Sequence, residues 1–263
     1  MRFIGQEGIL KELQYIIPEF EIGNNMNILF AAPSGFGKTT LALLIVGKLK
    51  QEENTVLYIP DNDGHIFLDL ERRFQIIDEA QTLKNPEILY PYMDKKDNSF
   101  FILTNELGLL KEPLINRCIP FYFQPYTNED ILEIVMDTLI TYEIDENLGE
   151  IIVQNCKNNP RVAIKLCERL ENIFKHKGIP KTREDIEFIL QDILGIYNGL
   201  NQMDFIYLRF LNSVEKAGLD AISNYTRLDK NTIRKEIEPF LLENGIIEIT
   251  SRGRILRKKI NVN

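Results

Sequence analysis

The stretch AAPSGFGKTT, residues 31–40, closely matches the phosphate-binding pattern G-x-x-x-x-G-K-[ST]. Gly37, Lys38 and Thr39 fill its last three positions, but Ala32 stands where the pattern has its first glycine. The apolar run NILFA before the loop is typical of a buried parallel strand, and KTTLALLIVGKLK after it has a helical period. A strand, a glycine-bearing turn and a helix predict a phosphate-binding loop in an α/β fold. Alanine is compatible with that loop if φ at residue 32 is negative.

The predicted loop is expected to hold phosphates mainly with its backbone. N–H groups of residues 34–39 can surround a phosphate at the N-terminus of the following helix, where the helix dipole favours negative charge. The expected nucleotide contacts here are Ser34, Gly35, Phe36, Gly37, Lys38, Thr39 and Thr40.

Two further apolar runs, FQIIDEAQ and FFILTN, predict buried strands that end in polar residues. Asp78, with Thr39, is the expected ligand pair for Mg²⁺, and Glu79 is the expected group that polarises an attacking water. Thr104 and Asn105 are placed to orient that water. Ligands bind at the carboxyl ends of strands in open α/β sheets, so these residues indicate one site for ATP and Mg²⁺.

Composition limits the class of protein. The 263 residues are 44% hydrophobic and 27% charged, which fits two or three packed domains. No apolar run reaches the roughly 18 residues of a membrane span, and no signal peptide is apparent. Three cysteines and two histidines without paired spacing make a structural zinc site improbable. We therefore expect a cytoplasmic protein with reduced thiols and no membrane contact.

The net charge of −8 is unevenly distributed. Residues 199–263 contain 11 Lys/Arg and 8 Asp/Glu, a net charge of +3, which leaves −11 on residues 1–198. A basic end on an acidic body favours local contact with DNA, although a mild lysine surplus is also typical of a solvated surface.

The chain beyond the predicted sheet separates into two parts. Residues 1–126 are expected to form the α/β domain, and capped helical patterns over 127–198 predict a small helical lid. In 199–263, three helical patterns precede a hairpin pattern that turns at Arg252-Gly253-Arg254, which predicts a winged helix. The expected DNA-phosphate contacts are Lys230, Arg234 and Lys235 on the second helix of a helix-turn-helix, with Arg252 and Arg254 at the wing tip. A winged helix used for protein contact is the alternative.

From FIGQEGILKEL to SRGRILRKKI the chain resembles the AAA+ ATPases, and within them the RuvB family of Holliday-junction branch-migration motors. The resemblance implies that Ile4, in FIGQ, lines an adenine pocket. It implies that Arg117, in the segment INRCIP, is an arginine finger that acts on a neighbouring subunit's ATP. It also implies that Pro160 and Arg161, in NNPRVAIKL, belong to the sensor 2 helix. A surface charge at 117 and an ordinary helix-start residue at 161 are the alternatives. The letters NRC also resemble clamp-loader subunits.

The chain departs from the RuvB pattern in two places. The lead-in before FIGQ is missing, and only Lys95 to Ser99 separate the acidic segment from the next strand. The family inserts here a β-hairpin that engages its partner RuvA. Five residues are too few for that hairpin, so a RuvA-type partner is not expected.

Together these features predict a RuvB-like AAA+ ATPase that forms a ring or spiral homo-oligomer, expected to be a hexamer, and acts on DNA. One alternative is a clamp- or helicase-loader-like switch that assembles a replication or recombination protein on DNA. The other is a non-motor adaptor that uses ATP only to oligomerise.

Overall fold

The computed structural model describes residues 2–258, and these form two compact units. The first unit contains the chain up to Glu133 together with Asn158–Arg161, and the second contains Ile134–Lys157 and the chain from Val162. The expected three-part division is finer than this one and stays a prediction.

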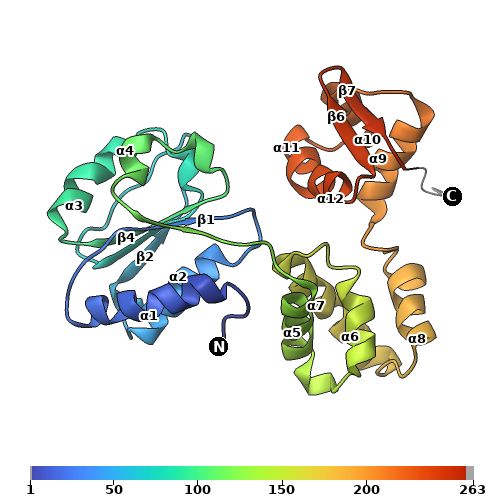
Figure 1. The fold of residues 1–263 in the computed structure, drawn as a ribbon, viewed down its shortest axis with the longest axis horizontal. Helices are drawn as coiled ribbons and strands as arrows, with labels where there is room; N and C mark the ends of the chain where they lie inside the picture. The colour runs from blue at the N-terminus through green and yellow to red at the C-terminus, as the bar shows by residue number, and fades with distance from the viewer. Residues whose placement is uncertain (1, 259–263) are drawn as a thin grey trace. The chain divides into compact units, whose positions relative to one another are not determined.

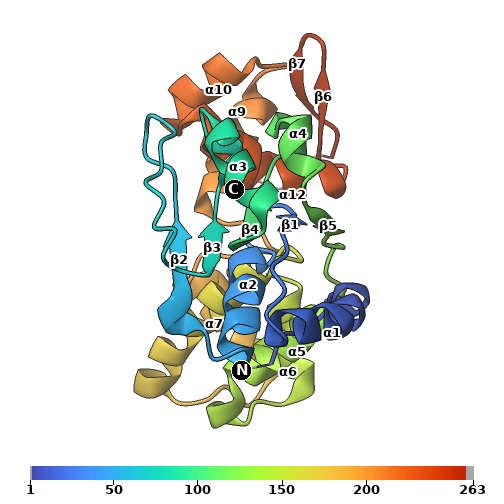
Figure 2. The same cartoon turned by 90° about the vertical axis from the view of Figure 1, so that its left-hand side faces the viewer.

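A five-stranded sheet forms the centre of the first unit (Figures 1 and 2). Its strands are β1 (Ile28–Ala31), β2 (Thr55–Tyr58), β3 (Phe74–Ile77), β4 (Ser99–Thr104) and β5 (Ile119–Tyr122). They lie in the order β2-β3-β4-β1-β5, and every neighbouring pair is parallel. The predicted α/β class with a parallel sheet is confirmed, and the carboxyl ends of all five strands meet at one edge.

Helices cover both faces of this sheet: α1 (Glu7–Glu21), α2 (Lys38–Lys48), α3 (Tyr90–Lys95) and α4 (Glu112–Ile115). Figure 1 shows α1 and α2 on one side of the sheet and α3 and α4 on the other. Successive strand residues point to opposite faces. Phe30 therefore packs in the cluster with Phe20 of α1, while Leu29 packs in the cluster with Leu114 of α4. The three central strands β1, β3 and β4 are buried on both faces, and their sequences are accordingly nearly continuous in apolar residues.

The connection from α3 to β4 is short. α3 ends at Lys95 and β4 begins at Ser99, so Lys96–Asn98 alone make the link. Lys96 has a φ of 57°, and the Asn25 amide donates to the carbonyls of Lys96 and Asp97 at 3.0 and 2.9 Å. In this fully described stretch there is no β-hairpin, as the sequence predicts.

The remaining helices before the winged helix are α5 (Asn128–Thr138), α6 (Glu146–Val153), α7 (Pro160–Lys177) and α8 (Arg183–Phe188). The predicted capping pattern before α8 is confirmed. Thr182 accepts from the backbone N–H of Asp185 at 3.2 Å, and the Asp185 carboxylate accepts from the Thr182 N–H at 3.1 Å. A second reciprocal cap, between Asn201 and Asp204, starts the winged helix.

A buried ion pair joins the link between α6 and α7 to the start of the winged helix, both within the second unit. Lys157 Nζ lies 2.6 Å from Asp204 Oδ2, and the backbone N–H of Gly199 donates to Asn155 Oδ1 at 2.8 Å. Burial raises the pKa of Asp204, while the Lys157 charge opposes that rise. Such a pair is costly to break, because one charge would be left buried alone.

The winged helix consists of α9 (Gln202–Ser213), α10 (Leu219–Thr226), α11 (Lys230–Thr232), α12 (Glu238–Glu243), β6 (Ile247–Thr250) and β7 (Gly253–Leu256). A π-helical turn, Ile233–Ile237, joins α11 to α12. β6 and β7 are antiparallel, with Thr250 opposite Gly253, so the wing turns over four residues. The turn thus comes earlier than expected and places Arg254 in a strand instead of at the tip.

The three cysteines, Cys118, Cys156 and Cys167, are all free thiols. Burial raises the pKa of Cys118 and that of Cys167 to about 12, and it raises the pKa of Cys156 as well. No helix within residues 2–258 is long and apolar enough to cross a membrane.

Candidate nucleotide site and DNA-contact surface

The phosphate-binding loop lies between β1 and α2, at the carboxyl edge of the sheet. Gly35 and Gly37 have φ values of 87° and 86°, in the region that favours glycine. The backbone φ of Ala32 is negative, and its N–H donates to the Thr104 carbonyl at 3.2 Å. Alanine therefore fits the turn, because the first position of the pattern needs no left-handed backbone here.

Residues from distant parts of the chain close around the loop. A Cβ on Gly35 would come within 2.4 Å of Asn159 Oδ1, and one on Gly37 within 3.1 Å of the Phe3 ring. The Tyr126 hydroxyl donates to the Phe36 carbonyl at 3.1 Å. Asn159, Phe3 and Tyr126 were not singled out from the sequence. Phe3 lies in FIGQ and Asn159 in NNPRVAIKL, the two segments to which the family resemblance gives nucleotide roles, but Tyr126 carried no such signal.

Lys38 is buried at the start of α2, and all three of its ammonium donors have acceptors. Nζ donates to the carbonyls of Ala32 at 2.8 Å and Pro33 at 3.0 Å, and to Asn105 Oδ1 at 2.6 Å. Burial lowers the pKa of Lys38 to about 8, partly opposed by the charges of Asp78 and Glu79. A cation held over a cradle of backbone N–H groups fits a phosphate ligand.

Thr39 and Asp78 form the pair expected to bind a metal. The Thr39 hydroxyl donates to Asp78 Oδ2 at 2.5 Å, and the other carboxylate oxygen accepts from the Glu79 N–H at 2.8 Å. A hydroxyl and a carboxylate are the hard oxygen donors that Mg²⁺ prefers, and Mg²⁺ sites in proteins commonly have one or two carboxylates. The donor set thus fits Mg²⁺. The described residues contain no cluster of three or more His, Cys, Asp or Glu that would favour another metal.

Glu79, the second residue after β3, has a left-handed backbone with a φ of 52°. Its carboxylate accepts from the Asn105 amide at 2.7 and 2.9 Å and from the Gln81 amide. Asn105 thus bridges Glu79 and Lys38, as a residue that orients water beside a phosphate would. Thr104 is fully buried and donates to Gln81 Oε1 at 2.8 Å, so its hydroxyl contacts Gln81 and not Glu79.

Arg161 reaches the loop within the first unit. Its Nη1 donates to the Ser34 hydroxyl at 2.9 Å, and the Asn159 amide donates to the Ser34 carbonyl at 3.0 Å. Pro160 begins α7 between these two residues, and its fixed φ suits a first helical position. The half-buried Ile4 and the exposed Thr40 are the two remaining expected nucleotide contacts, and both stay predictions.

The side chain of Arg117 contacts residues outside the phosphate-binding loop. Its guanidinium makes two hydrogen bonds to the Asp94 carboxylate, at 2.9 and 3.1 Å, and lies over the Tyr90 ring at 4.4 Å. It also donates to the Pro113 carbonyl at 2.8 Å. Among the described residues, these partners lie on α3 and α4 and none belongs to the phosphate loop. That arrangement is compatible with a role on a neighbouring subunit, which stays a prediction.

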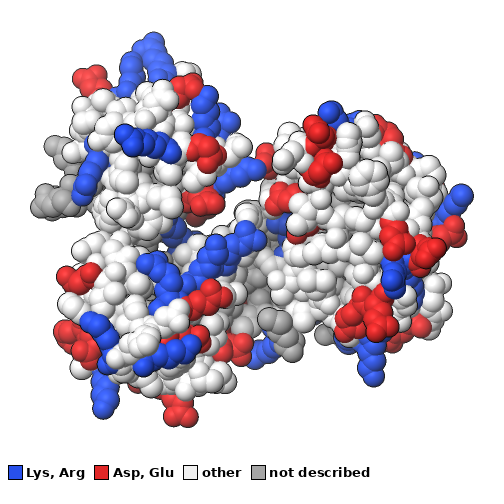
Figure 3. Space-filling model, turned by 180° about the vertical axis from the view of Figure 1, so that it is seen from behind, with Lys and Arg blue, Asp and Glu red and all other residues white. Residues whose placement is uncertain are grey.

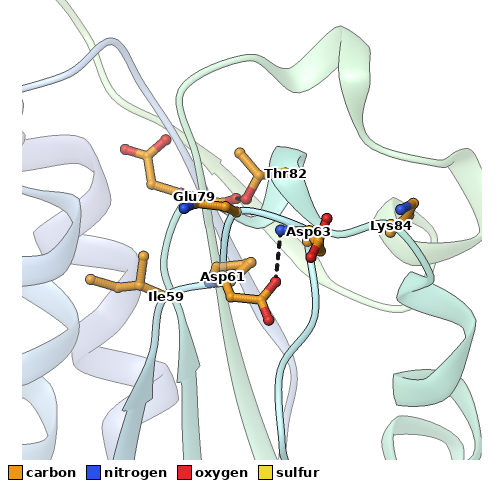
Figure 4. A pocket seen from close by; sticks show the side chains of 9 residues that line it. Ile59, Asp61, Asp63, Glu79, Thr82 and Lys84 are labelled. Atoms are coloured by element: carbon orange, nitrogen blue, oxygen red, sulfur yellow. Dashed lines mark hydrogen bonds between the residues drawn. The ribbon is translucent and has the colours of Figure 1, made fainter.

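A cavity of about 560 Å³ lies beside Glu79, between the segment after β2 and the turn after β3. Figure 4 shows the Asp61 carboxylate directed back to its own loop, where it accepts from the Asp63 N–H at 2.9 Å. Gly64 packs so closely on the next segment that a Cβ would lie 2.4 Å from the Thr82 carbonyl. The segment after β2 is therefore fixed against the residues that follow Glu79.

The basic residues of the winged helix differ in how they are placed. Figure 3 shows Lys and Arg side chains along the upper margin of this part, interspersed with acidic ones. Arg234, Lys235 and Arg252 are exposed, and Lys230 is exposed while paired with Asp220. These four stay candidates for DNA contact.

Arg254 differs from the expectation. Its Nε and Nη2 donate to the two oxygens of Glu238 at 2.7 and 3.1 Å, and the Arg254 and Glu238 side chains are only 12% and 3% exposed. The Tyr207 hydroxyl also donates to Glu238, at 3.1 Å. Arg254 lies in β7 and points into the domain, whereas Arg252 lies in the turn before β7 and is exposed. Arg254 is thus part of a buried ion pair and does not stand at the exposed wing tip, where the sequence predicted a contact with DNA phosphates.

Comparison with known proteins gives a consistent assignment. Residues 197–260 match the family described as the RuvB C-terminal winged helix domain. The Holliday junction branch migration complex subunit RuvB of Mycoplasma genitalium is 30% identical over 292 residues, covering 97% of this chain and 92% of the relative. The same subunit from Campylobacter lari is also 30% identical, covering 98% and 87%.

Solved structures agree with these relatives. Thermotoga maritima RuvB, described as a Holliday junction branch migration motor, superposes with a TM-score of 0.79 at 26% identity, covering 97% of this chain and 93% of the other. With a curated relative at 30% identity over nearly the whole chain, and with this fold, the chain belongs to the RuvB family of AAA+ ATPases.

Proposed function

We propose that this protein hydrolyses ATP with Mg²⁺ in an oligomeric ring and uses the cycle to move branched DNA. The observation that carries the proposal is the convergence of Lys38, Glu79 and Asn105 in one hydrogen-bonded chain at the carboxyl edge of the sheet. The relatives' description as branch migration subunits supports the DNA substrate.

Each residue has a distinct proposed task. Lys38 and the loop N–H groups hold the phosphates, and Thr39 with Asp78 holds the metal ion, which neutralises negative charge on the phosphates when bound. Glu79 takes a proton from the attacking water, and Asn105 orients that water. In this arrangement the protein supplies position and electrostatic stabilisation, which dominate phosphoryl transfer.

The oligomer is proposed to complete the site. Among the described residues the carboxylate partner of Arg117 is the exposed Asp94, so Arg117 can exchange this partner for the ATP of a neighbouring subunit. Arg161 would sense the nucleotide held by its own loop, since it already contacts Ser34. A closed ring, most simply a hexamer, gives every site one such neighbour.

The winged helix is proposed to contact the DNA backbone through Arg234, Lys235, Lys230 and Arg252. All four are exposed, and phosphate contacts by such side chains carry no sequence information. This suits a motor that must move along any sequence.

A second function, loading another protein onto DNA, is favoured by one observation. The α3–β4 link of Lys96–Asn98 leaves no room for the hairpin with which RuvB engages RuvA. We propose that the protein works without a RuvA-type partner. A pull-down with a RuvA protein, and ATPase assays with and without it, test this proposal; tight binding and strong stimulation would refute it.

The ATPase proposal is tested with two variants. Lys38→Ala should abolish binding of Mg·ATP in calorimetry, because the phosphates lose their fixed cation. Glu79→Gln should keep the affinity but lose turnover, because the amide cannot accept the proton. Wild-type turnover in either variant would refute the assignment. Branch migration on a synthetic four-way junction, absent in Glu79→Gln, separates a motor from a loader.

A further inference from the structure

Gln81 is a residue that neither the motif nor the family resemblance assigns to the site. It lies in the short turn Ala80–Thr82 after β3, and it is half-buried. Its Oε1 accepts from the Thr104 hydroxyl at 2.8 Å and from the Asn105 N–H at 3.2 Å. Its Nε2 donates to the Glu79 carboxylate. One side chain thus connects the catalytic carboxylate to β4.

The orientation of the Gln81 amide is determined by its partners. The backbone N–H of Asn105 can only donate, so the Gln81 atom that faces it must be the oxygen. The Thr104 hydroxyl accepts from the Glu106 N–H at 3.1 Å and is therefore set to donate its own proton to the same oxygen. The nitrogen of Gln81 consequently faces Glu79, with no equivalent flipped arrangement.

The backbone that carries Gln81 is held as firmly as its side chain. The Lys84 N–H donates to the Gly64 carbonyl at 3.0 Å, and the Thr82 carbonyl is packed against Gly64. On the other side, the buried Thr104 carbonyl accepts from Ala32 at 3.2 Å. Gln81 is therefore a fixed donor, and Glu79 is the movable member of the pair.

Both Glu79 oxygens are engaged in this arrangement. Asn105 donates to each of them, and Gln81 adds a further donor to Oε2. Lone pairs that accept these hydrogen bonds are not available to a water molecule. The left-handed backbone of Glu79 is an uncommon conformation for a side-chain residue, and such conformations cluster at switch regions.

We infer that Gln81 is a positioning residue that restrains Glu79 against β4 and keeps ATP turnover low until the restraint is released. The inference rests on the proposed ATPase function. Release follows from Lys38: its three donors are all used here, so holding a phosphate exchanges at least one of them. Asn105 is the acceptor that also binds Glu79, and its movement disturbs the same carboxylate.

Two Gln81 variants separate restraint from simple support of the strand. Gln81→Leu removes every polar contact of the side chain. Gln81→Glu keeps an acceptor for Thr104 and Asn105 but places a carboxylate against Glu79. If Gln81 restrains Glu79, both variants raise DNA-free kcat, by roughly tenfold for the loss of one charge-assisted hydrogen bond. The dissociation constant for a non-hydrolysable ATP analogue should change by less than about twofold, because neither variant alters a group that holds phosphate.

A second measurement does not depend on activity. In the nucleotide-free protein, hydrogen exchange in a peptide spanning residues 78–84 should be faster in Gln81→Leu, because the turn after β3 loses its tie to β4. In Gln81→Glu, which keeps the acceptor for Thr104 and Asn105, exchange should stay closer to wild type while kcat rises. Gln14→Leu, on the exposed face of α1, is the matched control and should change neither kcat nor exchange. Thermal melts confirm that each variant is folded.

The outcomes are distinct. Wild-type kcat in both variants, or lower kcat at unchanged nucleotide affinity, overturns the restraint. A defect in Gln81→Leu with wild-type behaviour in Gln81→Glu also overturns it, since strand support alone would then explain the residue. An inactive wild-type protein, or full activity in Glu79→Gln, would refute the ATPase proposal on which this inference rests, whereas the results with the Gln81 variants bear on the restraint alone.

Discussion

Two charged clusters, one in each unit, use the same residue types in different ways. At the nucleotide site, Lys38 and Glu79 do not bond to each other, because the Asn105 amide lies between them. In the winged helix, Arg254 bonds directly to Glu238 with both ends of its guanidinium. The first cluster can exchange partners when a ligand arrives, and the second is complete without one.

The difference shows that residue type does not decide function; the availability of the charge does. A cation bonded to neutral carbonyl and amide oxygens keeps its net charge for an anionic ligand. A guanidinium that is neutralised by a carboxylate and buried no longer offers charge to DNA.

Arg117 tests whether an exposed, exchangeable ion pair serves catalysis. Arg117→Ala should lower kcat by roughly 10³–10⁵-fold, the range for arginine fingers, with little change in nucleotide affinity. Its surface pair with Asp94 contributes little to stability, so the melting temperature should hardly move.

Mixing distinguishes action within a subunit from action between subunits. A Lys38→Ala subunit keeps its Arg117, so an equimolar mixture with Arg117→Ala should recover activity. Mixed oligomers that form but stay inactive would exclude an arginine finger that acts between subunits.

Glu238 tests how much the buried Arg254–Glu238 ion pair contributes to stability. Glu238→Ala leaves Arg254 buried without its partner and should cost about 3–5 kcal/mol of winged-helix stability, measured by denaturant unfolding. Nucleotide affinity should be unchanged, because the residue lies in the second unit. The double variant Glu238→Met with Arg254→Met should recover most of the loss; if it does not, the pair is required for more than charge balance.

Arg252 tests whether the exposed arginine of the wing contacts DNA while the buried Arg254 does not. Arg252→Ala should weaken DNA binding equally across sequences and reduce the salt slope by about 1, for one lost phosphate contact. Arg254→Lys, which keeps a cation beside Glu238, is the control and should leave the slope unchanged. An unchanged slope in Arg252→Ala would favour a winged helix that contacts protein.

Ala32 gives the smallest expected effect. Ala32→Gly restores the usual pattern but adds freedom to the unfolded chain, so stability should fall by about 0.4–1 kcal/mol. The affinity for ATP should not change, because φ at this position is already negative. A clear gain in affinity would show that the methyl group obstructs the site.

Much of the nucleotide site could be predicted from sequence because its residues follow strands. Asp78 and Asn105 come directly after apolar runs, Lys38 closes the loop that follows another, and parallel strands bring their carboxyl ends together. Asn159 and Gln81 could not be found in this way, since their roles depend on contacts with distant segments. Neither position has a local pattern that indicates those contacts.

Arg254 could not be placed from sequence for a different reason. A shift of one residue in a hairpin turn moves a side chain to the opposite face. The expected turn at Arg252-Gly253-Arg254 exposed both arginines, whereas the observed turn, with Thr250 opposite Gly253, exposes only one. The partner Glu238 lies on a helix, and no local pattern connects it to the wing.

The low reactivity of the buried thiols has a practical consequence for labelling this protein with a fluorescent dye. Burial raises the pKa of the Cys118 thiol to about 12, so little of it is ionised at neutral pH, and the thiolate is the form that reacts. A cysteine introduced at an exposed position, such as Ser251 on the wing, would therefore react with a maleimide dye far faster than the native ones. Pairing that dye with a fluorescent nucleotide would let energy transfer report, molecule by molecule, whether the wing moves with each turnover.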